Sequence, residues 1–92
     1  MKNKANEANI VIGILQRGWV VVGYCTEQSD CVVFDSASVI RVWGTSHGLG
    51  EIALKGPTPN TILDPCGRVK VYRETTVALI DTKTSIWKSH LK

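Results

Sequence analysis

The 92-residue chain is long enough for one domain with a modest core and too short for a catalytic cleft between two lobes. Its hydrophobic fraction of 43% and charged fraction of 21% are those of a globular protein and exclude long disorder. The net charge of +3 comes from scattered lysines and arginines, so charge alone does not predict nucleic-acid binding.

Targeting and redox features predict a cytoplasmic protein. No run reaches the roughly 18 apolar residues of a membrane-spanning helix, and Met1 to Asn9 lacks the apolar stretch of a secretion signal. The cysteines Cys25, Cys31 and Cys66 are odd in number and lack Cys-x-x-Cys spacing, which predicts neither a disulfide scaffold nor a zinc site. We therefore expect free thiols, no metal and no cofactor.

The sequence of the N-terminal half predicts a series of short strands. Residues 1–8 are polar and predict a flexible terminus, so a single domain is expected over residues 9–92. The β-branched runs Asn9–Leu15 and Gly18–Cys25 flank Gln16-Arg17-Gly18, a sequence typical of a hairpin turn.

Two further strands are expected after this hairpin. A polar turn leads to Cys31–Phe34, and a turn at Asp35–Ser38 leads to Val39–Trp43. The period of two along the latter strand puts Arg41 and Trp43 on the same face.

A short helix is predicted between Gly44 and Gly56. Ser46 or Gly48 can cap its start, Gly56-Pro57 ends it, and its apolar residues recur at helical spacing, at Leu49, Ile52 and Ala53.

The C-terminal half predicts a second hairpin and a short helix. A short extended piece at Thr61–Leu63 precedes a turn at Asp64–Gly67. The alternation in Arg68–Arg73 then predicts a strand paired with Thr76–Ile80. From Asp81 onward a helix capped by Asp81 or Thr82 is favoured over a strand, with three side chains on one side, Ile86, Trp87 and His90.

Together these elements predict a mainly β (α+β) fold. We expect a small barrel-like or meander antiparallel sheet of about six strands with one or two short helices.

The sequence does not present a catalytic set. Ser46 and His47 are adjacent in a loop, which does not establish the geometry of a nucleophile and its base. The carboxylates lie mainly at predicted turns, and the segment Gly44–Gly48 completes neither a Walker A nor a dinucleotide fingerprint. We therefore expect a protein that is not an enzyme.

A ligand cradle, meaning a binding site around Arg41 and Trp43, is a stronger candidate than a catalytic site. The strand ending in Arg41 and Trp43 runs into Thr45, Ser46 and His47 before the helix, which brings a guanidinium and an indole close to hydroxyls and backbone N–H groups. Trp43 could stack on a base while Arg41 or Arg68 binds a phosphate. The alternative is a packed tryptophan covered by arginine.

Other aromatic residues give weaker signals. Lys70 and Tyr72 share the outward face of their strand with Arg68, which predicts either an interaction patch or a solvated face. Trp19 and Trp87 are expected in the core or in a subunit interface.

The stretch Ser38–Gly56 resembles a family of small uncharacterised domains found largely in bacteriophages. The resemblance lies in an Arg-x-Trp pair, a turn of small residues and a short Leu/Ile/Ala helix that ends in glycine, and it continues into Arg68–Asp81. It implies a small accessory protein of phage type that acts in the bacterial cytoplasm.

Three hypotheses follow. The first is an antagonist of bacterial antiviral defence that sequesters a nucleotide-like signal or blocks a host protein, as a homo-oligomer, because small chains build pockets readily at subunit junctions. The second is a nucleic-acid-binding accessory module. The third, a small enzyme acting through Ser46, His47 or a carboxylate, is the least favoured.

Overall fold

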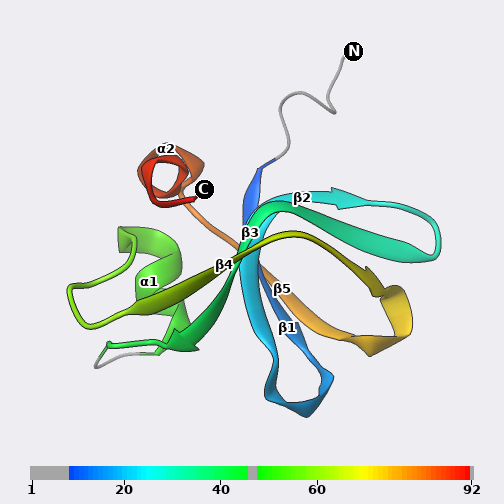
Figure 1. The fold of residues 1–92 in the computed structure, drawn as a ribbon, viewed down its shortest axis with the longest axis horizontal. Coiled ribbons are helices and arrows are strands. Elements are labelled where there is room, and N and C mark those ends of the chain that lie inside the picture. Colours follow the sequence, from blue (N-terminus) through cyan, green and yellow to red (C-terminus); the bar gives the residue numbers. More distant parts are fainter. Residues whose placement is uncertain (1–8, 46–47, 92) are drawn as a thin grey trace.

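The computed structural model describes residues 9–45 and 48–91, which form one twisted antiparallel sheet with two short helices (Figure 1). The strand order is β4-β3-β2-β1-β5. The elements are β1 Ile10–Leu15, β2 Val20–Glu27, β3 Cys31–Val42, α1 Leu49–Lys55, β4 Ile62–Tyr72, β5 Thr76–Asp81 and α2 Thr84–Trp87. Single 3-10 turns occupy Gln16–Gly18, Arg73–Thr75 and Lys88–His90. The mainly β prediction is confirmed.

The first four strands are neighbours in chain order, which confirms the predicted meander in this part of the sheet. The hairpin turn at Gln16–Gly18 also forms where the sequence predicted it. Two of its residues have positive φ, Arg17 at 65° and Gly18 at 81°, and Leu15 N–H donates to the Trp19 carbonyl at 2.8 Å.

The predicted turn at Asp35–Ser38 is wrong, because β3 continues through it. The pairing of β3 with β4 shifts register between Phe34 and Ala37 and again between Ala37 and Ser38, and Ser36 has a φ of 49°. Neighbouring strands on both sides hold this segment in the sheet. Local turn propensity thus yields a bulge instead of a reversal.

The predicted turn at Asp64–Gly67 is likewise part of a continuous strand, β4. Pro65 lies opposite Ser38, and Gly67 lies opposite Ala37 with a φ of 78°. Because β4 is an edge strand, a proline that lacks an N–H can be tolerated there. In both places two segments that were predicted to be separate form one continuous strand. The described residues therefore form five strands and not about six.

The predicted second hairpin is wrong, because β5 pairs with β1 and not with β4. Leu79 lies opposite Gly13, and Ile80 lies opposite Ile12. The 3-10 turn Arg73–Thr75 carries the chain from one edge of the sheet to the other. Alternation within a strand identifies its inner face but does not identify its neighbour.

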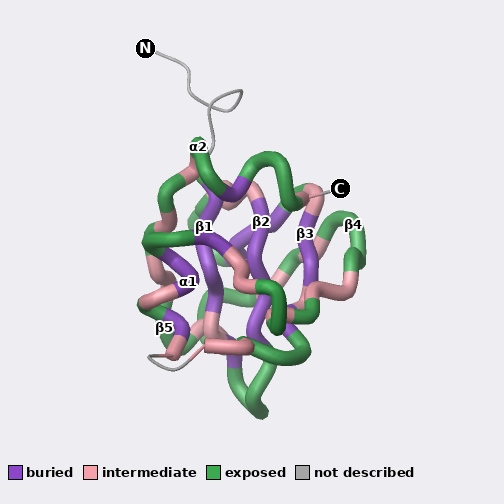
Figure 2. The backbone as a smooth tube through the Cα atoms, turned by 90° about the vertical axis from the view of Figure 1, so that its left-hand side faces the viewer, coloured by how far each residue is buried: buried purple, intermediate pink, exposed green. Residues whose placement is uncertain are grey.

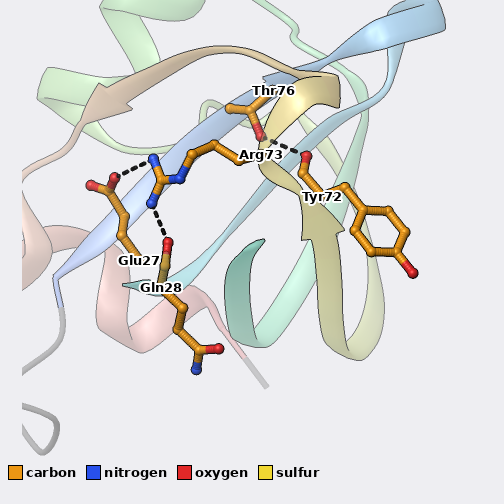
Figure 3. Close-up of polar contacts among 5 residues, drawn as sticks. All are labelled: Glu27, Gln28, Tyr72, Arg73 and Thr76. Carbon is orange, nitrogen blue, oxygen red and sulfur yellow. Dashed lines mark hydrogen bonds and ion pairs between the residues drawn. The ribbon is translucent and has the colours of Figure 1, made fainter. Parts of the chain in front are cut away.

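Arg73 holds the connection between β4 and β5 against the β2–β3 turn (Figure 3). Its guanidinium donates to the Glu27 carboxylate at 3.2 Å and to the Gln28 carbonyl, and its backbone N–H donates to the Asp30 carbonyl at 3.1 Å. The contacts tie two segments far apart in sequence.

The sheet is buried on both faces, and Figure 2 shows the buried positions concentrated along β1, β2 and β3. The cluster beneath the helices comprises Ile10, Ile12, Val20, Val22, Ile40, Leu49, Ile52, Ala53 and Trp87. The cluster on the other face comprises Val11, Leu15, Val21, Val32, Phe34 and Ala37. Val69 of β4 and Leu79 of β5 both pack on this second cluster, so the sheet curls until its two edges share one core.

The helix α1 forms as predicted. Leu49, Ile52 and Ala53 are buried, and the helix ends at Gly56, whose φ of 86° favours glycine. Its N-cap is Gly48, one of the two predicted caps; the other, Ser46, lies outside the described residues.

The C-terminal helix is confirmed as α2, but its cap is Lys83. Asp81 belongs to β5, and the Thr82 hydroxyl donates to the Ile10 carbonyl at 2.6 Å. Trp87 is buried and its ring lies 6.1 Å from that of His90, whereas Ile86 is exposed, so the three predicted neighbours do not share one buried side.

Candidate ligand-binding groove

A groove of about 390 Å³ opens where β2 diverges from β3. The pairing of the two strands begins at Val21 and Val39, so the residues before Val21 and those after Val39 are not held together by ladder hydrogen bonds. The groove is lined by Arg17, Gly18, Trp19, Val20, Val39, Ile40, Arg41, Asp64, Pro65 and Cys66.

Trp19 is the most prominent side chain of this groove. It follows the β1–β2 turn directly and is 55% exposed. Of the two positions expected for it, core or subunit interface, the core is therefore wrong, whereas Trp87 is fully buried in the core as expected. Exposed tryptophan offers a large apolar face at low entropic cost. In the sequence, the signal for this exposure was the position of Trp19 directly after the predicted turn Gln16-Arg17-Gly18.

Arg41 and Asp64 form the polar wall of the groove. The Arg41 Nε lies 2.7 Å from Asp64 Oδ2, and its terminal nitrogen lies 3.3 Å from Oδ1, which makes a bidentate pair. The hydrogen bond from Arg41 lowers the pKa of the Asp64 carboxyl, and the same contact raises the pKa of Arg41. Both groups therefore stay charged at neutral pH, and with Arg17 the groove carries a net positive charge.

A second groove of about 340 Å³ adjoins the first. It lies between the β1–β2 turn and the end of β4, and it is lined by Leu15, Gln16, Arg17, Trp19, Val69, Val71 and Thr75. Its floor is apolar because Leu15, Val69 and Val71 belong to, or pack on, the second core cluster. Arg17 and Trp19 border both grooves.

The structure separates the residues of the predicted cradle. Arg41 lines the first groove, whereas Trp43 and Thr45 line neither. Trp43 is 43% exposed, and its carbonyl accepts a hydrogen bond from the Thr61 hydroxyl at 2.6 Å. The Thr45 hydroxyl donates to the Gly48 carbonyl at 2.9 Å. Ser46 and His47 lie outside the described residues.

The outward residues of β4 lie as the alternation predicted. Arg68, Lys70 and Tyr72 are exposed, while Val69 and Val71 are half-buried. The Arg68 guanidinium lies 3.4 Å from the Asp35 carboxylate. Tyr72 is 70% exposed, and its ring points away from the Arg73 contacts in Figure 3. These three residues lie outside both grooves.

The thiols offer little chemistry at the site. Cys25, Cys31 and Cys66 are all unpaired. Cys66 lines the first groove, and burial raises the pKa of its thiol. Among residues 9–45 and 48–91, no group of three or more histidine, cysteine or acidic side chains is placed to hold a metal ion. No helix in this part of the chain is long and apolar enough to cross a membrane.

Comparisons with known proteins identify little. No protein-family model matches the chain. A stretch of 73 residues, 75% of the chain, is 36% identical to part of the bifunctional protein GlmU of Mycolicibacterium vanbaalenii. The match spans only 15% of that protein's length, so it does not assign the chain to a family.

Proposed function

We propose that the chain is a non-enzymatic, phage-type accessory protein that antagonises a bacterial antiviral defence by sequestering a nucleotide-like signal. The observation that carries the proposal is the half-exposed Trp19 at the rim of a groove that also contains Arg17 and Arg41. The protein acts in the bacterial host cytoplasm as a homo-oligomer.

The lining chemistry suits a nucleotide. An indole face can stack on any base, which contributes about 1–3 kcal/mol per base in single-strand recognition. Guanidinium groups bind phosphate oxygens through paired hydrogen bonds. Asp64 orients the exposed Arg41 guanidinium along the groove wall, and the N–H groups that do not contact Asp64 can still donate to a ligand.

Sequestration is favoured over blockade of a host protein because both grooves are concave and of small-molecule size. Small-molecule sites typically measure roughly 300–1,000 Å³ and combine apolar walls with a few polar groups. The first groove has this composition, with Val39, Ile40 and Pro65 beside Arg41 and Asp64.

The test is isothermal titration calorimetry of the full chain with cyclic di-GMP, cyclic GMP–AMP, cyclic di-AMP and ADP-ribose. We expect at least one of them to bind. Trp19→Ala should weaken that binding by roughly tenfold or more, given the stacking energy. Arg17→Ala should weaken it as well, while Lys88→Ala, which removes the same charge outside both grooves, should leave it unchanged.

Trp43→Ala provides the matched aromatic control, since this tryptophan is comparably exposed but borders neither groove. A loss of binding in Trp43→Ala with normal binding in Trp19→Ala would place the site at the loop after β3 instead. Absence of heat and of any thermal shift across the whole panel would reject sequestration.

A second candidate function is binding of single-stranded nucleic acid, favoured by the exposed Arg68, Lys70 and Tyr72 on the edge strand β4. Retardation of DNA or RNA should then weaken steeply with added salt and in Tyr72→Ala. Lack of retardation at low ionic strength would eliminate this function.

A further inference from the structure

We infer that Arg17 binds the phosphate group of the ligand, and that the first groove therefore selects nucleotides over nucleosides. The inference rests on the proposed function and assigns its phosphate contact to one residue. It starts from the charge balance of the four arginines in the chain, of which three pair with a carboxylate. These pairs are Arg41 with Asp64, Arg68 with Asp35 and Arg73 with Glu27.

Arg17 is the exception among the four. Its side chain is exposed and forms no ion pair or hydrogen bond within residues 9–45 and 48–91. It also borders the first groove, where Trp19 offers an exposed surface for stacking. The arginine whose charge is not balanced thus lies beside the groove proposed to hold an anionic ligand.

Arg41 borders the same groove, but Asp64 offsets its charge. The Arg41 Nε lies 2.7 Å from Asp64 Oδ2. A phosphate that approaches this pair is attracted by the guanidinium and repelled by the carboxylate at similar distances, so the two effects largely cancel. Arg41 therefore contributes hydrogen bonds from its remaining N–H groups, while the net positive charge of the groove comes from Arg17.

The backbone of Arg17 supports the same role. Its φ of 65° and ψ of 25° lie in the left-handed region, which is unfavourable for most residues with a Cβ but is adopted readily by glycine and asparagine. Gly18 follows with a φ of 81°. Hairpin turns with two successive residues of positive φ favour asparagine followed by glycine. Arginine is thus an unfavourable residue for the turn itself, and such residues cluster at functional sites.

The test titrates the full chain and its Arg17→Asn variant with cyclic di-GMP, cyclic GMP–AMP, cyclic di-AMP and ADP-ribose by calorimetry. Each ligand that binds the unaltered chain should bind the variant at least about tenfold more weakly, because a charge-assisted hydrogen bond is lost. The double variant Arg41→Gln/Asp64→Asn removes one charge of each sign. It should therefore weaken binding less than Arg17→Asn does.

Lys88→Asn is the matched control. It removes the same charge and introduces the same residue at an exposed position outside both grooves, so it should leave the affinity unchanged.

Matched pairs of ligands isolate the phosphate. AMP and GMP should bind at least about tenfold more tightly than adenosine and guanosine, which lack only this group. Arg17→Asn should bring the two monophosphates down to the affinity of the nucleosides and leave the nucleosides unchanged.

Melting temperatures separate binding from folding. Asparagine adopts the left-handed conformation more readily than arginine, so Arg17→Asn should leave the melting temperature unchanged or raise it. Weaker binding by a variant at least as stable as the unaltered chain does not come from unfolding. A lower melting temperature would show that Arg17 supports the turn, and it would overturn the inference.

The remaining outcomes separate this inference from the proposed function. Trp19-dependent binding of a nucleotide that Arg17→Asn leaves undiminished would overturn the role of Arg17 while leaving sequestration intact. A nucleoside that binds as tightly as its monophosphate would do the same. A greater loss in the double variant than in Arg17→Asn would assign the phosphate to Arg41 instead. Failure of every nucleotide to bind would overturn both the inference and the proposed function.

Discussion

The indole nitrogen of Trp87 donates a hydrogen bond to the carbonyl oxygen of Ile52 at 2.9 Å inside the core. The bond joins α2 to α1 and fixes both helices over the cluster that also contains Ile10 and Ile12. The Ile52 carbonyl accepts a second hydrogen bond, from the Gly56 N–H at 2.8 Å, at the end of α1. The buried Ile52 carbonyl thus links the C-terminal end of α1 to α2.

Replacing Trp87 with phenylalanine should lower the free energy of unfolding by about 1–2 kcal/mol. The hydrogen bond is lost, but the Ile52 carbonyl keeps its bond from Gly56, so no orphaned acceptor remains. Trp87→Ala should cost about 3–5 kcal/mol, because it also leaves a cavity. Urea unfolding followed by circular dichroism measures both. Trp43→Phe, at an exposed position, should change stability by less than about 0.5 kcal/mol, and a larger effect there would contradict this reasoning.

Gly13→Ala should destabilise the fold by about 1–3 kcal/mol through overpacking. A Cβ at this position would lie 2.6 Å from the ring of Phe34, which is fully buried in the core. Phe34→Leu should relieve the clash, so the double variant should be more stable than the sum of the two single effects predicts. A thermal-unfolding double-mutant cycle measures this coupling. Additive effects would show that the ring and the glycine do not constrain one another.

The Arg41–Asp64 pair should support stability at neutral pH and lose its contribution in acid. The pKa of Asp64 is lowered in the folded chain, so the contribution is complete above the ordinary carboxyl pKa of about 3.9 and disappears as the pH falls through the lowered value. Carbon NMR titration of the Asp64 carboxyl measures the pKa directly. Arg41→Gln should raise it towards the ordinary value, whereas Lys88→Gln should not, and an unchanged pKa in Arg41→Gln would show that another group causes the shift.

The three thiols should differ in their reactivity towards iodoacetamide. Burial, with a smaller contribution from Glu27, raises the pKa of Cys25 to about 11, so at pH 8 only roughly a thousandth of it is the reactive thiolate. Cys31 is buried, whereas Cys66 is exposed, and burial raises the pKa of the Cys66 thiol less than that of Cys25. Mass spectrometry of the folded protein should therefore find Cys66 labelled first, and all three labelled in urea. Faster labelling of Cys25 than of Cys66 would contradict the raised pKa.

Several elements could be read from short-range pattern alone. The helix α1 begins and ends at glycines that flank a run of apolar residues at helical spacing, and the structure buries Leu49, Ile52 and Ala53 as that spacing requires. The alternation of Val69 and Val71 with charged residues likewise gave the correct inner face of β4. Such patterns depend only on the backbone period, which each segment carries by itself.

The neighbours of each segment could not be read in this way. Polar residues at Asp35–Ser38 and Asp64–Gly67 are typical of turns, yet each segment lies opposite the other in adjacent strands and becomes a bulge. In the same way, β5 follows β4 closely in sequence but pairs with β1. Which strand lies beside which depends on burying apolar side chains from the whole chain, and a local window does not contain that information.

The sequence by itself determined a small β-rich fold and the helix that ends at Gly56, because these follow from composition and periodicity, and its residue chemistry predicted Arg41 as a candidate binding residue. The tertiary structure alone decided which groups accompany Arg41. It brings Asp64 and Trp19 to the same groove from positions more than 20 residues away in the chain, and it leaves Trp43 outside. Curling of the sheet is the physical reason, since it brings the β1–β2 turn against β4 while β2 and β3 part.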